Sequence, residues 1–104
     1  MNPEDHGLRP QDLKIIEQAV AKELPASQAP KLWLFGSRAT RTHKKYSDVD
    51  LLLEASPPAT RAQLSKIRES LEESSLPYKV DILRPDDVYP AFLDSIENQK
   101  IPLA

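Results

Sequence analysis

Apolar and polar residues follow two different periods along this chain, one typical of helices and one typical of strands. Residues 10–25 carry apolar side chains at helical spacing, which predicts a helix with one apolar face. Pro10 suits the first helical position and Pro25 ends the pattern. The apolar positions of this helix are Leu13, Ile16, Val20 and Leu24. Residues 60–74 predict a second amphipathic helix, with Leu64, Ile67 and Leu71 facing inward.

Three shorter runs predict strands. Residues 31–35 are aliphatic and aromatic, as in a buried strand. Residues 48–54 alternate, so that successive side chains point to opposite faces of a sheet. One face of this strand carries Val49, Leu51 and Leu53, and the other carries Asp48, Asp50, Leu52 and Glu54. In residues 78–83, Tyr78, Val80 and Ile82 share one face while Asp81 takes the other.

A last helix is expected near the C-terminus, with Phe92, Leu93 and Ile96 among its apolar positions. Asp86 or Asp87 could cap it, and Pro90 implies that it begins late or is bent. Strands that alternate with helices predict the α/β (α+β) class. We therefore expect one domain, residues 1–104, with a small mixed β-sheet of about three strands. Helices should pack on its apolar face, which leaves the aspartates on the opposite face.

The composition fits an ordinary globular domain, with 39% hydrophobic and 29% charged residues. A net charge of -2 argues against nucleic acid as a direct partner, since binding it needs a clustered basic surface. Residues 1–5 lack the apolar segment of a signal peptide, and no apolar run approaches the roughly 20 residues of a membrane span. The expected location is therefore the cytoplasm. The absence of cysteine excludes disulfides and thiolate metal sites.

The aspartates carry the candidate chemistry. Asp48 and Asp50 are two residues apart on a strand, so both project to one face with roughly 6.5–7 Å between their Cα atoms. Asp81 would lie across from them if its strand pairs with theirs. Carboxylate oxygens suit Mg²⁺ or Mn²⁺, and two such ions bind both reacting centres in phosphate chemistry. The alternative is that Asp48 and Asp50 are ordinary solvent-facing acids, but aspartate is disfavoured in strands such as that of Asp81.

A Gly-Ser turn follows the first strand. Gly36 allows a sharp turn and the close approach of a ligand. Backbone amides at the start of a short helical turn, and the hydroxyl of Ser37, can donate hydrogen bonds to phosphate oxygens. A plain strand-ending turn is the alternative interpretation, which the Asp-x-Asp pattern further along the chain makes less favourable.

These motifs together resemble the minimal nucleotidyltransferases of the DNA polymerase β superfamily. The resemblance is carried by Leu-Phe-Gly-Ser-Arg-Ala at 34–39, Lys-Lys-Tyr-Ser-Asp-Val-Asp-Leu at 44–51 and Leu-Pro-Tyr-Lys-Val-Asp-Ile-Leu at 76–83. It is strongest to small prokaryotic antitoxin-type proteins that are encoded beside a partner with a HEPN domain. The implied fold is nucleotidyltransferase-like and covers nearly the whole chain.

The resemblance implies roles for individual residues. Gly36 and Ser37 would hold the β- and γ-phosphates of a nucleoside triphosphate, ATP by likeness, with Arg38 and Ser47 also at the nucleotide. Asp48 and Asp50 would bind two Mg²⁺ or Mn²⁺ ions, and Asp81 would complete the metal site and help to deprotonate the acceptor hydroxyl.

The implied reaction moves a nucleoside monophosphate to a hydroxyl of a small helical HEPN-domain partner and releases pyrophosphate. An antitoxin that binds nucleotide without catalysis, and neutralises its partner by complex formation, is the alternative.

One departure from the family pattern concerns Arg41, where such proteins often carry a second glycine. Arginine is strained there if the position needs a positive φ, and fits if the position is helical. The surrounding basic run could bind phosphate or form a solvated loop. It comprises Arg38, Arg41, His43, Lys44 and Lys45.

Overall fold

The computed structural model describes residues 7–44 and 47–103, which form a four-stranded mixed sheet in the order β3-β2-β1-β4. Strand β1 is antiparallel to both β2 and β4, whereas β2 and β3 run parallel. Parallel neighbours need a crossover connection, which α3 provides. The strands are β1 (Lys31–Phe35), β2 (Val49–Glu54), β3 (Val80–Leu83) and β4 (Ile101–Pro102).

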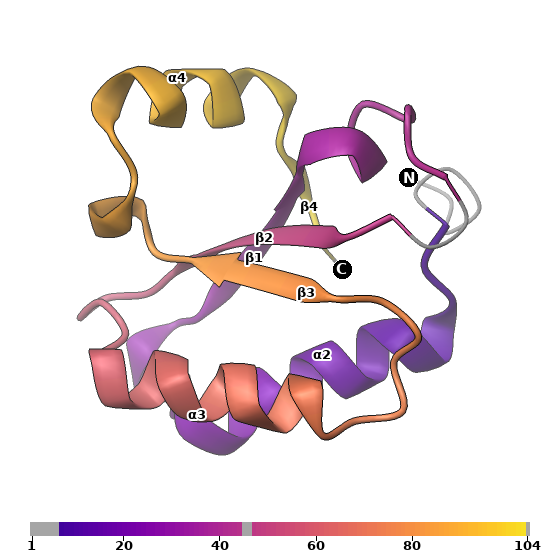
Figure 1. The fold of residues 1–104 in the computed structure, drawn as a ribbon. Coiled ribbons are helices and arrows are strands. Elements are labelled where there is room, and N and C mark those ends of the chain that lie inside the picture. Colours follow the sequence, from indigo (N-terminus) through magenta and orange to yellow (C-terminus); the bar gives the residue numbers. More distant parts are fainter. Residues whose placement is uncertain (1–6, 45–46, 104) are drawn as a thin grey trace.

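Helices cover both faces of this sheet (Figure 1). Helices α2 (Pro10–Glu23) and α3 (Arg61–Glu72) lie on one face, and α4 (Pro90–Gln99) lies on the other. Three short 3-10 turns connect the elements: η1 (Ala26–Gln28), η2 (Gly36–Arg38) and η3 (Pro85–Asp87). None of the described helices combines the length and apolar character that crossing a membrane requires.

The expected fold class is confirmed, with two additions. Strand β4 is two residues long and contains a proline, so it leaves no alternating pattern in the sequence. Helix α4 departs from the expected placement of the helices on one face. It buries Leu52, the apolar residue on the aspartate face of β2, in a small cluster with Phe35 and Ile96.

The ends of the helices have local causes. Helix α3 begins after Thr60, whose hydroxyl accepts from the Gln63 backbone N–H at 3.1 Å, while the Gln63 side chain accepts from the Thr60 N–H at 2.9 Å. Helix α4 begins late, at Pro90, as the proline predicts. Asp87 does not cap it, because this carboxylate instead pairs with Arg84 at 2.8 Å. Asp86, the other candidate cap, precedes it in η3, and the residue at the N-cap is Tyr89.

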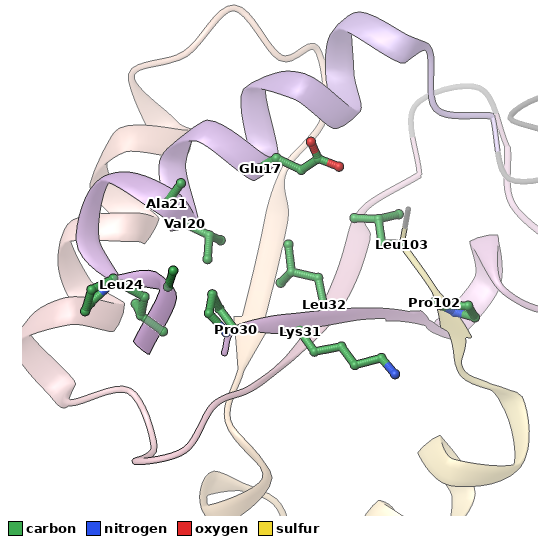
Figure 2. Close-up of a pocket in the computed structure, with 11 residues that line it drawn as sticks. Glu17, Val20, Ala21, Leu24, Pro30, Lys31, Leu32, Pro102 and Leu103 are labelled. Atoms are coloured by element: carbon green, nitrogen blue, oxygen red, sulfur yellow. The ribbon is translucent and has the colours of Figure 1, made fainter. Parts of the chain in front are cut away.

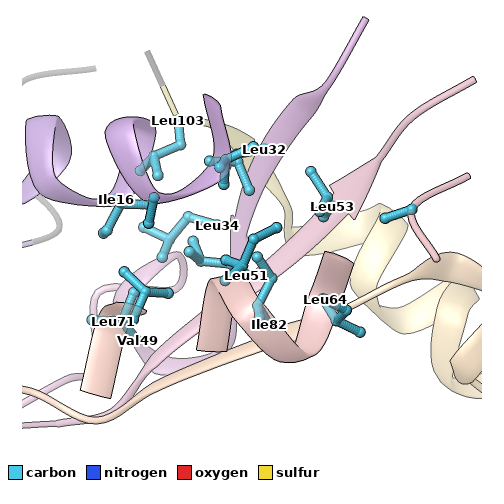
Figure 3. Packing of buried hydrophobic residues seen from close by; sticks show 14 of the residues in the cluster. Ile16, Leu32, Leu34, Val49, Leu51, Leu53, Leu64, Leu71, Ile82 and Leu103 are labelled. Atoms are coloured by element: carbon cyan, nitrogen blue, oxygen red, sulfur yellow. The ribbon is translucent and has the colours of Figure 1, made fainter. Parts of the chain in front are cut away.

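The main core fills the space between the sheet and the helices α2 and α3 (Figure 3). Each fully buried leucine or isoleucine contributes about 1.5–3 kcal/mol relative to exposure. Val49 and Leu51 are completely buried there. Because side chains alternate along a strand, their burial forces Asp50 to the opposite face. The core thereby decides where the candidate site lies. Its labelled members are Ile16, Leu32, Leu34, Val49, Leu51, Leu53, Leu64, Leu71, Ile82 and Leu103.

Candidate nucleotide and metal site

Two of the three aspartates are direct neighbours in the sheet. Asp50 of β2 and Asp81 of β3 are register partners, so their side chains leave adjacent parallel strands on the same face. The sequence predicted that Asp81 lies across from Asp48 and Asp50 if their strands pair. Strands β2 and β3 do pair. Asp48 directly precedes β2 and is exposed, as is Asp81, whereas Asp50 is half-buried.

The electrostatics of this group are unfavourable without a cation. Burial raises the pKa of Asp50, and the negative charges of Asp81 and Asp48 raise it further. Within the described residues, no lysine or arginine forms an ion pair with any of the three aspartates. Three hard oxygen donors without a positive partner are the kind of group that binds Mg²⁺ or Mn²⁺.

Gly36 lies against this carboxylate group. It follows Phe35, the register partner of Asp50, and its φ of 75° lies in the left-handed region. A Cβ at this position would collide with the Asp50 carboxylate. The turn therefore requires glycine for two reasons, its backbone conformation and the closeness of Asp50.

Ser37 has two donor groups without a partner among the described residues. Its carbonyl accepts from the Thr42 backbone N–H at 2.8 Å, which closes the loop after η2. Its hydroxyl and its backbone N–H have no hydrogen-bond partner among the described residues. This is the arrangement expected of a residue that donates to a phosphate.

Arg38 and Ser47 are placed differently from the sequence-based expectation. Arg38 is only 1% exposed, and its Nη2 donates to the Ser47 carbonyl at 2.9 Å. The guanidinium carbon lies 4.4 Å from the centre of the Tyr78 ring. The hydroxyl of Ser47 accepts from the Lys44 backbone N–H at 2.7 Å. This geometry favours a role in holding the loop before Asp48 over the expected contact with phosphate.

Arg41, in the loop between η2 and β2, has a positive φ. Its φ is 63°, so the position is left-handed and not helical, and arginine is strained there. His43 is half-buried, and its Nδ1 has no hydrogen-bond partner among the described groups. Lys45, in the same basic run, lies outside the described residues.

Sequence reasoning missed Gln99 at the end of α4. Its side-chain oxygen accepts from the Gly36 backbone N–H at 2.8 Å, across 63 positions of sequence. No local pattern marks this glutamine, because the contact depends on α4 crossing the aspartate face.

The donors fit a divalent metal by their chemistry, but they are spread out. In the described part of the chain, no three acidic, histidine or cysteine side chains lie close enough to enclose a metal ion. The fit rests on the negative neighbours of Asp50 and on the absence of a positive partner for it among the described residues.

A cavity lies beside α2, away from the aspartates. It has a volume of about 610 Å³ and separates the C-terminal half of α2 from the edge formed by β1 and β4 (Figure 2). Its lining is mostly aliphatic and proline, and Glu17 and Lys31 are its charged residues. It contains none of the aspartates, so we place the candidate site at the sheet face and not in this cavity.

A mixed sheet with paired aspartates beside a Gly-Ser turn is the arrangement expected of a nucleotidyltransferase-like fold. The chain belongs to the family described as "Polymerase beta, Nucleotidyltransferase", whose model matches residues 9–104. The expected family resemblance is thus confirmed.

Two relatives carry related names. The "Probable protein adenylyltransferase MntA" of Haemophilus influenzae is 36% identical over 74 residues, which cover 69% of this chain. The match spans 65% of the length of that relative, so it leaves about a third of the relative unmatched. A Methanocaldococcus jannaschii protein, provisionally named a protein adenylyltransferase, is 32% identical over 65% of this chain and 72% of its own length.

One solved structure shares the fold. It is titled "Crystal structure of the toxin-antitoxin with AMP-PNP" and matches with a TM-score of 0.70 at 20% identity. The match covers 89% of this chain and 73% of the other chain. At this identity the likeness supports the nucleotidyltransferase-like fold alone.

Proposed function

We propose that this protein transfers AMP from ATP to a hydroxyl group on a partner protein. The observation that carries the proposal is the register pairing of Asp50 with Asp81 beside the Gly36 turn. Family membership and the names of the two relatives support the same chemistry.

In this reaction, the acceptor oxygen attacks the α-phosphorus of ATP and forms a new O–P bond. The bond between the α-phosphorus and the bridging oxygen breaks, and pyrophosphate leaves with that oxygen. The proton of the acceptor hydroxyl passes to a carboxylate. We assign this role to Asp81, because it is more exposed than its register partner Asp50.

The chain's own residues divide the remaining work. Ser37 donates from its hydroxyl and its N–H to the triphosphate, and Gly36, which has no Cβ, lets the Asp50 carboxylate lie against the turn. Asp48, Asp50 and Asp81 would hold two Mg²⁺ ions. When bound, such ions offset the negative charge of the phosphates and of the reacting oxygens.

The acceptor is proposed to be a protein. Helix α4 packs on the sheet face of the aspartates against Phe35 and Leu52, while Asp48 and Asp81 remain exposed. A partner that brings its hydroxyl to this face would complete the site. The toxin-antitoxin title of the related structure supports a toxin as this partner, and a small helical HEPN-domain protein is our specific proposal.

Binding of nucleotide without transfer is the second candidate. It is favoured by the spread of the three carboxylates, which do not enclose a metal ion in this conformation. Such a protein would bind MgATP and neutralise its partner by forming a complex with it.

Incubation of the protein with the product of the neighbouring gene, Mg²⁺ and each nucleoside triphosphate separates these functions. Intact mass measurement should show an increase of one AMP on the partner with ATP. No mass increase with any nucleotide, together with retained MgATP binding, would replace transfer by the non-catalytic function.

The variants assign the roles. Asp48→Asn combined with Asp50→Asn should abolish both transfer and Mn²⁺-dependent ATP binding in calorimetry. Asp81→Asn should remove transfer while weakening MgATP binding much less, because its role lies mainly in the transition state. Asp94→Asn, an exposed aspartate on α4, is the matched control and should change neither.

A further inference from the structure

The backbone N–H of Gly36 does not point toward the aspartates. In the antiparallel pair of β1 and β4, Leu34 pairs with Ile101, and Leu103 donates to the carbonyl of Leu32. Alternate residues of a strand direct their backbone groups to the same side, so Gly36 faces the β4 side, as Leu32 and Leu34 do. Its N–H therefore points within the plane of the sheet, toward the β4 side.

Continuing this register pairs Gly36 with position 99, since Trp33 pairs with Pro102 and Leu34 with Ile101. At position 99 the chain is still helical, because α4 ends there. The side chain of Gln99 supplies the missing acceptor instead, with its oxygen 2.8 Å from the Gly36 nitrogen. A side-chain carbonyl thus extends the ladder at the point where the nucleotide turn begins.

The end of α4 that carries Gln99 is firmly held. The next residue, Lys100, contacts Glu97 at 2.9 Å and Glu54 at 3.3 Å. Its ammonium group also lies 4.1 Å from the centre of the Trp33 ring. These contacts fix the helix end against β1 and β2, so Gln99 meets Gly36 from a defined direction.

We propose that Gln99 is a positioning residue for the nucleotide turn. Its hydrogen bond to Gly36 fixes the start of η2, so that the free hydroxyl and N–H of Ser37 face the phosphates. Gly36 then contributes its left-handed backbone conformation and not its own N–H to nucleotide binding. The inference rests on the proposed nucleotide site, but its structural part can be tested without any transfer.

The protein has two glycines, so labelling with ¹⁵N-glycine gives two backbone amide signals. Carbonyl-¹³C phenylalanine identifies the Gly36 signal, since Phe35 precedes it and His6 precedes Gly7. In nucleotide-free protein, the Gly36 amide should exchange with solvent about tenfold faster in Gln99→Met, the factor that one neutral hydrogen bond is worth. Gln99→Glu keeps an acceptor and should restore slow exchange.

The same variants test the effect on the nucleotide. Gln99→Met should weaken MgATP binding about tenfold, by loss of the fixed turn. Asn98→Met, at the exposed neighbouring position, should leave both exchange and binding unchanged. The single tryptophan, Trp33, lies beneath Lys100, and its unchanged emission in Gln99→Met shows that α4 is still docked.

Unchanged Gly36 exchange in Gln99→Met would overturn the proposal. Tighter MgATP binding in this variant would also overturn it, because Gln99 would then compete with phosphate for the Gly36 N–H. If the exchange results appear as expected while the wild-type protein binds no nucleotide, the nucleotide site fails and the ladder contact stands.

Discussion

Asp12 and Asp50 lie on opposite faces of the sheet and have opposite surroundings. Asp12, on α2, is completely buried, and it accepts from the Arg9 side chain at 2.9 Å and from the Tyr78 hydroxyl at 3.1 Å. Burial alone would raise the pKa of Asp12, but the hydrogen bonds from Arg9 and Tyr78 outweigh it and lower this pKa. Asp50 is half-buried among other carboxylates, and its pKa is raised.

The difference shows that burial does not by itself mark a functional carboxylate. Asp12 has its positive and hydrogen-bonding partners within the chain, so it stabilises the fold. Asp50 has negative neighbours instead, and only a group from outside the described chain can satisfy it. The partners of a carboxylate, more than its depth, separate the structural residue from the candidate ligand.

The largest expected effect concerns the satisfied carboxylate. Asp12→Ala should lower the free energy of unfolding by about 3 kcal/mol at pH 7, because a buried carboxylate and its hydrogen bonds with Arg9 and Tyr78 are lost. Since the folded pKa of Asp12 is lowered, its contribution is present above the unfolded pKa and is lost as the pH falls through the folded value. Denaturant titrations at pH 7 and at low pH measure this difference.

Asp94→Ala is the control for that comparison and should change stability little at either pH. An equal loss at both pH values would show that the ionised form of Asp12 is not what stabilises the fold.

Gly36→Ala should cost about 2 kcal/mol, from the left-handed backbone and the contact of the new Cβ with Asp50. A double-mutant cycle with Asp50→Ala separates these two causes by urea denaturation. The cost should fall to that of the backbone alone when the carboxylate is absent. Strictly additive effects would mean that the turn and Asp50 are not in contact.

Asp50→Asn should raise the free energy of unfolding at pH 7 in buffer with a chelator, by less than Gly36→Ala lowers it, because the neutral side chain removes the cost of a half-buried charge beside Asp81 and Asp48. The folded pKa of Asp50 is raised, so the wild-type protein loses stability as the pH rises from the unfolded value through the folded one. The advantage of Asn should therefore vanish at low pH.

Added Mg²⁺ should also remove this advantage by satisfying the wild-type carboxylates. Thermal unfolding with and without Mg²⁺ measures the stability difference between Asp50→Asn and wild type. If the variant is less stable than wild type in chelator, the Asp50 carboxylate stabilises the fold, as that of Asp12 does.

The smallest effect tests strain near the site. Arg41→Gly should raise stability by about 0.5 kcal/mol, because relief of the left-handed backbone exceeds the added entropy of the unfolded chain. Ala29→Gly is the matched change far from the aspartates in sequence, where φ is also positive at 46°. Thermal unfolding of both variants compares them; a gain at Ala29 alone would mean that other contacts of Arg41 offset its strain.

Local patterns in the sequence determined the face on which Asp50 lies and the turn beside it. Alternation along β2 places Val49 and Leu51 on one face and Asp50 on the other, so the burial of the two apolar residues puts Asp50 on the opposite face. Likewise, the spacing of Leu64, Ile67 and Leu71 predicted the buried face of α3, and all three are buried. Such features depend on neighbours within a few residues.

The choice of polar partners was decided only by the tertiary structure. The sequence shows a glutamine at 99 and an aspartate at 12, but their contacts with Gly36 and Tyr78 span 63 and 66 positions. The sequence motif predicts a contact of Arg38 with phosphate. In the structure this side chain is buried and donates to the Ser47 carbonyl, in the loop that leads to Asp48. A buried polar side chain forms hydrogen bonds with the groups that are buried next to it. The packing of the whole chain decides which groups these are.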